Sequence, residues 1–139
     1  MIVLDTNVLS EIMRPRPAAT VMGWVAAQAA ADLYTTSVTQ AEILHGLMLL
    51  APGRRRSALE AAATSMFEED FAGRILGFGS DAASVYARIA SERRRAGRPI
   101  SHFDAQIAAI TRFAGATLAT HNTADFAGCG VTLVDPWTS

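Results

Sequence analysis

The sequence predicts an α/β fold of three layers, in which helices cover both faces of a five-stranded parallel sheet. Short apolar runs alternate with stretches of helical periodicity, the pattern that parallel sheets produce. Of the 139 residues, 50% are hydrophobic and 18% are charged, which excludes a disordered or coiled-coil chain. No linker, internal repeat or low-complexity segment interrupts the pattern, so we expect one domain over residues 1–139.

The first elements alternate strand and helix. Ile2–Leu4 is an apolar run that predicts a buried strand, and the polar residues after it lead into a helix at about Val8–Met13. Pro17 suits the first turn of a second helix, which we expect to run to about Ala31. Leu33–Thr35 is then expected to form the second strand.

The middle of the chain predicts two helices followed by a strand. Ser37 and Gln40 have the spacing of a capping box, with Ser37 as the N-cap of a helix that ends before Pro52. The next helix is expected at about Arg54–Phe71, and Arg74–Phe78 is expected to be the third strand.

Two helices and two strands complete the prediction. Ser80 or Asp81 opens a long helix that ends near Gly97, and Ser101 with Asp104 repeats the capping-box spacing for a helix that ends at Gly115. The remaining elements are expected to be a strand at Thr117–Thr120, a short helical turn capped by Asn122, and a strand at Val131–Val134.

Four acidic residues fall where an open parallel sheet places its ligands, near the carboxyl ends of the strands. Asp5 follows the first strand, Asp125 lies after the fourth, and Glu42 and Asp104 lie near the beginnings of helices. Asp104 and Asp125 also suit plain helix capping. Asp5 is harder to explain that way, because a charge at the end of an apolar strand needs a partner.

Four converging carboxylates raise each other's pKa unless a cation neutralises them. The sequence contains no lysine, so the available cations are arginine or a divalent metal. An all-oxygen ligand set suits Mg²⁺ or Mn²⁺ rather than zinc. Such a centre activates water and stabilises the charge that develops on a phosphodiester, so we expect metal-dependent hydrolysis of a nucleic-acid backbone.

Four blocks in this order resemble the PIN-domain endoribonucleases, and more closely the VapC toxins of bacterial toxin–antitoxin pairs, in the FitB-like branch. They are Met1–Asn7 (MIVLDTN), Thr39–Gly46 (TQAEILHG), Arg98–Ala109 (RPISHFDAQIAA) and Leu118–Phe126 (LATHNTADF). The resemblance extends almost to the end of the chain, where Asp135-Pro-Trp137 stands for the usual Asn-Pro-Trp. It implies a parallel sheet with the strand order 3-2-1-4-5.

The resemblance also assigns roles to residues. It makes Asp5, Glu42, Asp104 and Asp125 the catalytic and metal-binding carboxylates, Glu42 often acting through water and Asp125 being the most variable in role. The polar neighbours of this site would be Thr6, Asn7, Thr120 and Asn122. This chain departs from the family at His121, where arginine is usual, and at Gly77-Phe78-Gly79, where Pro-Phe-Asp is common.

The partners implied by the resemblance are an RNA substrate, a VapB-like antitoxin whose peptide covers a groove beside the acidic pocket, and a second copy of the chain. Larger toxin–antitoxin complexes and operator DNA, the latter reached only through the antitoxin, follow from the same resemblance. An alternative stays open, in which the chain is a catalytically idle PIN-like binding module that acts mainly in such a DNA-bound complex.

Other features exclude rivals or stay open. The missing lysine argues against P-loop, Schiff-base and aspartyl-phosphate enzymes, and a single cysteine excludes an intrachain disulfide. We expect a cytoplasmic protein with no membrane partner, because neither a signal peptide nor a long apolar segment is present. The basic runs Arg54–Arg56 and Arg93–Arg98 suit either solvated helix ends or RNA contact, and roles for His102 and His121 stay open.

Overall fold

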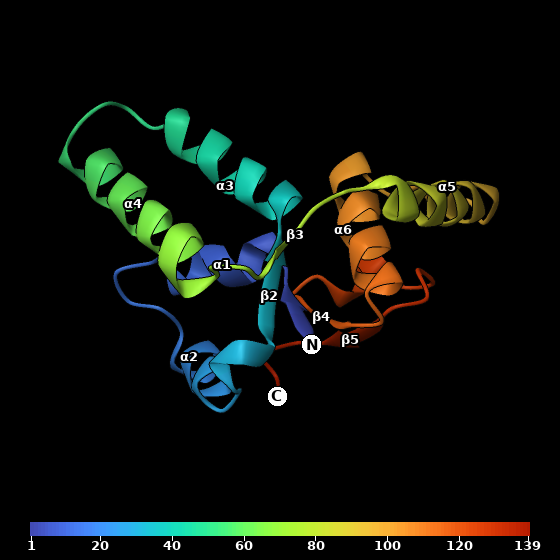
Figure 1. Ribbon diagram of the computed structural model, residues 1–139, viewed down its shortest axis with the longest axis horizontal. Coiled ribbons are helices and arrows are strands. Elements are labelled where there is room, and N and C mark those ends of the chain that lie inside the picture. The colour runs from blue at the N-terminus through green and yellow to red at the C-terminus, as the bar shows by residue number, and fades with distance from the viewer.

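The computed structural model describes residues 1–139 and contains one sheet of five parallel strands (Figure 1). Their order across the sheet is β3-β2-β1-β4-β5, as the resemblance implied. β1 lies in the centre, pairing Val3 with Tyr34 of β2 on one side and with Leu118 of β4 on the other. The strands are β1 (Ile2–Leu4), β2 (Leu33–Thr36), β3 (Ile75–Leu76), β4 (Thr117–Ala119) and β5 (Thr132–Val134).

Helices cover both faces of the sheet, which confirms the predicted three layers. Figure 1 shows α5 and α6 on one side of the strands and α1, α3 and α4 on the other. The helices are α1 (Thr6–Ile12), α2 (Ala19–Ala26), α3 (Ser37–Met48), α4 (Arg54–Ser65), α5 (Ser80–Arg95) and α6 (His102–Phe113). None of them has the length and apolar character needed to cross a lipid bilayer.

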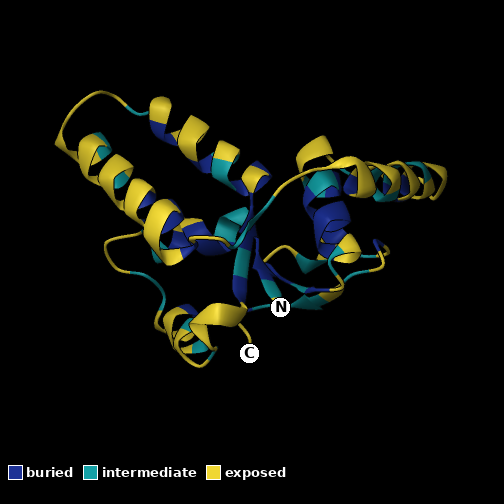
Figure 2. Cartoon of the chain, in the orientation of Figure 1, coloured by how far each residue is buried: buried dark blue, intermediate teal, exposed yellow.

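Two apolar cores lie on opposite faces of the sheet, because successive side chains of a strand alternate between its faces. Val3 and Leu118 belong to the core beneath α5 and α6, whereas Leu4 and Ala119 belong to the core beneath α1, α3 and α4. Figure 2 shows this burial along the central strands and in α6, while α4 and the outer side of α3 are exposed. The central strands are therefore held from both sides.

The N-cap of α3 differs from the prediction. The capping residue is Thr36, whose side-chain oxygen accepts a hydrogen bond of 3.0 Å from the main-chain N–H of Thr39. Ser37, predicted as the cap, is the first helical residue and is exposed. The strand β2 extends one residue further than predicted, which moves the cap back by one position. The cap of α6 is Ser101, as predicted, and it binds the N–H of Asp104 at 3.2 Å.

Two helices also differ from the prediction at their C-terminal ends. The helix predicted to reach Ala31 ends at Ala26, where Gln28 Nε2 donates to the Trp24 carbonyl, and a 3-10 turn follows at Ala30–Asp32. The helix predicted at Arg54–Phe71 continues beyond Ser65 as a π-helical turn, Met66–Asp70.

Two smaller predictions were also inaccurate. β3 has only two residues where Arg74–Phe78 was predicted, although Arg74 still contacts β2: its main-chain carbonyl accepts the Thr35 N–H at 3.1 Å and its Nε donates to the Leu33 carbonyl at 2.9 Å. Asn122 precedes the 3-10 turn η3 (Thr123–Phe126) but makes no side-chain capping bond.

The position of the α3 cap gives a stability prediction. Thr36→Val keeps the shape of the side chain and removes the oxygen that binds the Thr39 N–H, so we expect the free energy of unfolding to fall by about 1–2 kcal/mol. The matched control, Ser37→Ala, changes an exposed residue of the first turn and should shift it by less than about 0.5 kcal/mol. Urea denaturation measures both; a larger loss in the control would contradict this assignment.

Candidate functional site

The site begins with Asp5, which follows β1 and is 3% exposed. Its main-chain N–H donates to the Ala119 carbonyl at 2.9 Å, so the ends of the central strands β1 and β4 meet here. The side chain accepts three hydrogen bonds: Oδ1 from the Thr6 N–H at 2.8 Å, and Oδ2 from Thr120 Oγ1 at 2.8 Å and Asn7 Nδ2 at 3.1 Å. These donors fix the orientation of a buried carboxylate.

Glu42 comes to the same place from α3. The Thr6 hydroxyl donates to Glu42 Oε1 at 2.8 Å and lies 3.1 Å from the Thr39 hydroxyl. Thr6 therefore binds Asp5 through its main chain and Glu42 through its side chain. This double contact ties the end of β1 to the first turns of α3, and sequence reasoning did not single out Thr39.

Asp104 is the third carboxylate, and it lies half-buried in the first turn of α6. With Asp5 and Glu42 it lines a cavity of about 560 Å³ at the carboxyl ends of the strands, which we call the carboxylate cavity. Asp125 is exposed in η3 and does not line this cavity, although its charge raises the pKa of Asp104. The structure thus brings three of the four predicted carboxylates together and places the fourth beside them.

The electrostatics of the three carboxylates are unfavourable in the absence of a cation. Burial raises the pKa of Asp5 to about 6, against hydrogen bonds from Thr120 and Thr6 that lower it, and the charges of Asp104 and Glu42 raise it further. Burial also raises the pKa of Glu42 and of Asp104 above their usual range. A bound cation would lower the electrostatic cost of ionising these carboxylates, because it stabilises the charged form of each one.

The predicted polar neighbours form a connected network around Asp5. Asn7 donates to Asp5 and to Thr120 Oγ1, and its Oδ1 accepts the main-chain N–H of His121 at 3.1 Å. The N–H of Asn122 donates to Thr120 Oγ1 at 3.1 Å, while the Asn122 side chain makes no hydrogen bond and lines the cavity. Thr6, Asn7 and Thr120 therefore orient the carboxylate directly, and Asn122 contributes through its main chain.

The donor set fits a hard divalent cation that keeps part of its water shell. The carboxylate cavity offers oxygen atoms from Asp5, Glu42 and Asp104 without a lysine to neutralise them. No three histidine, cysteine or acidic side chains converge closely enough to bind one ion directly. Mg²⁺ typically binds through one or two carboxylates and retains several waters, so this arrangement suits it.

Arg93 has a structural role that the sequence analysis missed. It is 7% exposed, and its Nη1 donates to the main-chain carbonyls of Asp125 at 2.8 Å and Ala127 at 3.1 Å. Its Nε also donates to the Arg98 carbonyl at 2.7 Å, so these main-chain contacts hold the segment that carries Asp125. The signal was present in the sequence, since Arg93 follows Ile89 by four residues on the buried face of α5.

Two more groups on the cavity were not predicted. Glu11 is 9% exposed and accepts hydrogen bonds from Arg14 Nη1 at 3.2 Å and from the Ala18 N–H at 3.0 Å. Trp137 lies against the ring of His121, with 4.3 Å between the ring centroids, and both side chains line the cavity. Trp137 is distant from the other cavity residues in the sequence, so spacing gave no sign of this contact.

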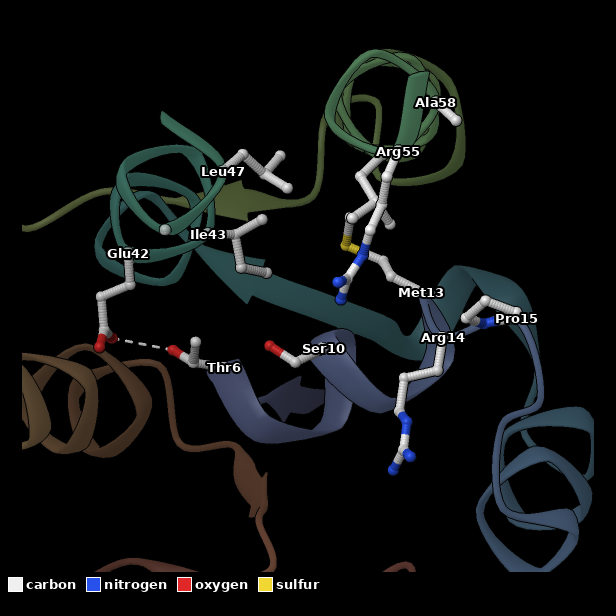
Figure 3. Close-up of a pocket in the computed structure, with 12 residues that line it drawn as sticks. Thr6, Ser10, Met13, Arg14, Pro15, Glu42, Ile43, Leu47, Arg55 and Ala58 are labelled. Carbon is white, nitrogen blue, oxygen red and sulfur yellow. Dashed lines mark hydrogen bonds between the residues drawn. The ribbon is translucent and has the colours of Figure 1, made fainter. Parts of the chain in front are cut away.

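An apolar groove lies next to the carboxylate cavity, between α1, α3 and α4 (Figure 3). It encloses about 520 Å³ and its apolar side chains include Met13, Ile43 and Leu47. Figure 3 shows Glu42 hydrogen-bonded to Thr6 at one end of this groove. The groove and the cavity share lining residues: Thr6, Ser10, Arg14 and Glu42.

Several known proteins resemble this chain in sequence over almost its whole length. Toxin FitB of Neisseria gonorrhoeae is 36% identical over 99% of both chains, and plasmid stability protein StbB of Pseudomonas syringae pv. tomato is 38% identical over 99% of both. VapC ribonuclease Y4jK of Sinorhizobium fredii is 35% identical over 99% of this chain and 98% of that protein.

A solved structure of FitAB bound to an IR36 DNA fragment contains a chain that superposes with a TM-score of 0.92. The two chains are 36% identical, and the match covers 99% of this chain and 96% of that one. The PIN domain family model matches residues 2–128. The chain therefore belongs to the PIN domain family.

Proposed function

We propose that this protein is a metal-dependent endoribonuclease and the toxin of a toxin–antitoxin pair, inhibited by its antitoxin. The observation that carries the proposal is the carboxylate cavity, where Asp5, Glu42 and Asp104 meet with raised pKa values and no lysine. The relatives' names support the same activity, since they include a VapC ribonuclease and a tRNA(fMet)-specific endonuclease VapC of Shigella flexneri, the latter 27% identical.

The proposed cofactor is Mg²⁺, with Mn²⁺ as a substitute, held by Asp5, Asp104 and Asp125 with Glu42 in support. When bound, such an ion lowers the pKa of water and stabilises negative charge on a phosphate. Asp5 is oriented for this role by Thr6, Asn7 and Thr120, which leave the carboxylate no freedom to turn. Asp125 lies outside the cavity lining, so its contribution would be the most indirect.

Thr6 sets the position of Glu42 within this proposal. Its hydroxyl binds Oε1 at 2.8 Å, and Oε2 has no hydrogen-bond partner in the protein. A carboxylate fixed at one oxygen presents the other to water at a defined place, which suits support of the centre through a water molecule. The half-buried Asp104 faces it from the first turn of α6.

The proposed antitoxin contact is the apolar groove between α1, α3 and α4. An amphipathic segment could bury its apolar side against Met13, Ile43 and Leu47. The shared residues Arg14 and Glu42 would bring the end of such a segment to the carboxylate cavity. The solved FitAB complex is bound to DNA, and we infer that operator DNA is reached here only through the antitoxin.

A second copy of the chain is the other proposed partner. α3 and α6 pack against each other and expose large apolar side chains, among them Leu44, Met48 and Phe103. Exposed apolar side chains on neighbouring helices are typical of association sites when they form a patch. We further propose that residues 1–139 form one domain, because both apolar cores pack on the same sheet.

Removing a cavity carboxylate should abolish cleavage. We expect Asp5→Asn and Asp104→Asn each to lower the rate of RNA hydrolysis by about 100-fold or more, because several kcal/mol of charge stabilisation is lost. The matched control Asp32→Asn changes an exposed aspartate in the turn before β2 and should leave the rate unchanged. The assay follows tRNA, rRNA and mRNA with Mg²⁺, Mn²⁺ or EDTA.

Two results would contradict the proposal. Equal cleavage by wild type and both folded variants would show that the carboxylates are not catalytic. No cleavage of any RNA by the partner-free wild type would favour the idle binding module.

The raised pKa values make the metal-free protein less stable as the pH rises. The folded state holds the Asp5 proton up to about pH 6, whereas the unfolded state releases it near pH 4, so folding binds protons in this window. Between about pH 4 and pH 7.5 we expect the Asp5 contribution to the free energy of unfolding to fall by about 2 kcal/mol. Asp5→Asn should flatten this slope and Asp32→Asn should not, as measured by denaturation in EDTA.

Binding of a divalent cation should oppose this loss. At about pH 7.5, Mg²⁺ or Mn²⁺ in excess over its dissociation constant should raise the Tm of the wild type, because the ion binds only the folded state. Asp5→Asn and Asp104→Asn should show a much smaller rise, and Asp32→Asn the full one. Equal rises in all four proteins, measured by calorimetry, would place the ion elsewhere.

A further inference from the structure

His121 is held by side chains from the end of the chain, in a way that the proposed metal centre does not need. Its Nδ1 lies 3.3 Å from both carboxylate oxygens of Asp135. Its ring packs on Trp137 at an interplanar angle of 33°. Asp135 Oδ1 also accepts the main-chain N–H of Trp137 at 2.9 Å, so one carboxylate contacts both the His121 ring and the main chain that carries Trp137.

This ring lies on the carboxylate cavity and remains accessible. His121 and Trp137 both line the cavity, and 52% of the His121 side chain is exposed. The other basic group on the lining is Arg14, which is bound to Glu11 at 3.2 Å. Asp135, the partner of His121, does not line the cavity.

The contacts of the ring determine what it can bind. When Asp135 accepts the Nδ1 proton, Nε2 is left without a protein partner. A ring that carries a proton on both nitrogens donates to Asp135 through Nδ1 and to an anionic oxygen through Nε2. Trp137 packs against the ring and holds its orientation. The arrangement is suited to an anion at Nε2.

We propose that His121 binds a backbone phosphate of the RNA that lies across the carboxylate cavity, with Asp135 and Trp137 as positioning residues. The inference rests on the proposed ribonuclease function. It adds to that function, because a ring that donates from the cavity lining gives a substrate phosphate a partner beside the carboxylates of Asp5, Glu42 and Asp104.

The first test is RNA binding without cleavage. In the Asp104→Asn background, a fluorescein-labelled oligoribonucleotide of randomised sequence is titrated by fluorescence anisotropy at several salt concentrations. We expect His121→Ala to weaken binding about tenfold, as loss of a charged hydrogen bond does. The slope of log affinity against log salt should shrink by about 0.7, the value for one phosphate contact on a single strand.

Matched variants separate a phosphate contact from a structural effect. His121→Arg restores a cation and should keep both the affinity and the salt slope. His121→Gln keeps a polar side chain without charge and should behave as His121→Ala. Trp137→Leu removes the supporting ring and should weaken binding less than His121→Ala, while His45→Ala changes an exposed histidine outside the carboxylate cavity and should leave binding unchanged.

The second test is kinetic and uses the otherwise unmodified protein with Mg²⁺. His121→Ala should raise KM about tenfold and change kcat by less than about threefold, because a phosphate contact away from the reacting bond stabilises substrate and transition state alike.

Several results would overturn the inference. They are an unchanged affinity and salt slope in folded His121→Ala, an equal loss in His45→Ala, and a failure of His121→Arg to retain the slope. Absence of any RNA binding by the wild type would overturn it as well. Failure of the ribonuclease proposal itself is distinguishable, because it would appear as absent cleavage by a protein whose anisotropy titration still depends on His121.

Discussion

The structure depends on burying one carboxylate at the end of its central strand. Asp5 is almost inaccessible to solvent, and its side chain is bound by Thr6, Asn7 and Thr120. A buried charge is tolerated only when such partners bind it, and a buried charge without partners costs several kcal/mol of stability. These three residues in turn bind Glu42 and the main chains of His121 and Asn122. The network around Asp5 therefore sets the geometry of the whole site.

The two apolar cores make this arrangement possible. Val3 and Leu4 are fully buried on opposite faces of the sheet, so the strand that carries Asp5 cannot shift to relieve the unfavourable charge. The pKa values of Asp5, Glu42 and Asp104 are raised, so ionising these carboxylates lowers the free energy of unfolding. A site of this kind is expected where structure serves binding or catalysis rather than stability.

Much of this could be predicted from the sequence because the signals are local. The end of an apolar strand located Asp5, and capping-box spacing located the beginning of α6 and hence Asp104. The cap of α3 was predicted one residue too late, since Thr36 and Ser37 are equally good capping residues and only the length of β2 decides between them.

Contacts across the sheet could not be found in this way. Residues that follow β4 and β5 are neighbours in space but far apart in the sequence. The contacts of His121 with Asp135 and with the ring of Trp137 therefore leave no periodic signal. For the same reason the hydrogen bonds of Arg93 to the carbonyls of Asp125 and Ala127 could not be predicted, although its buried position on α5 follows from helical spacing.

The apolar groove shares Thr6, Ser10, Arg14 and Glu42 with the carboxylate cavity. A segment that occupies the groove and reaches these residues would exclude a nucleic acid from the same atoms, so the two ligands would compete, each lowering the apparent affinity of the other in proportion to its own concentration over its own dissociation constant.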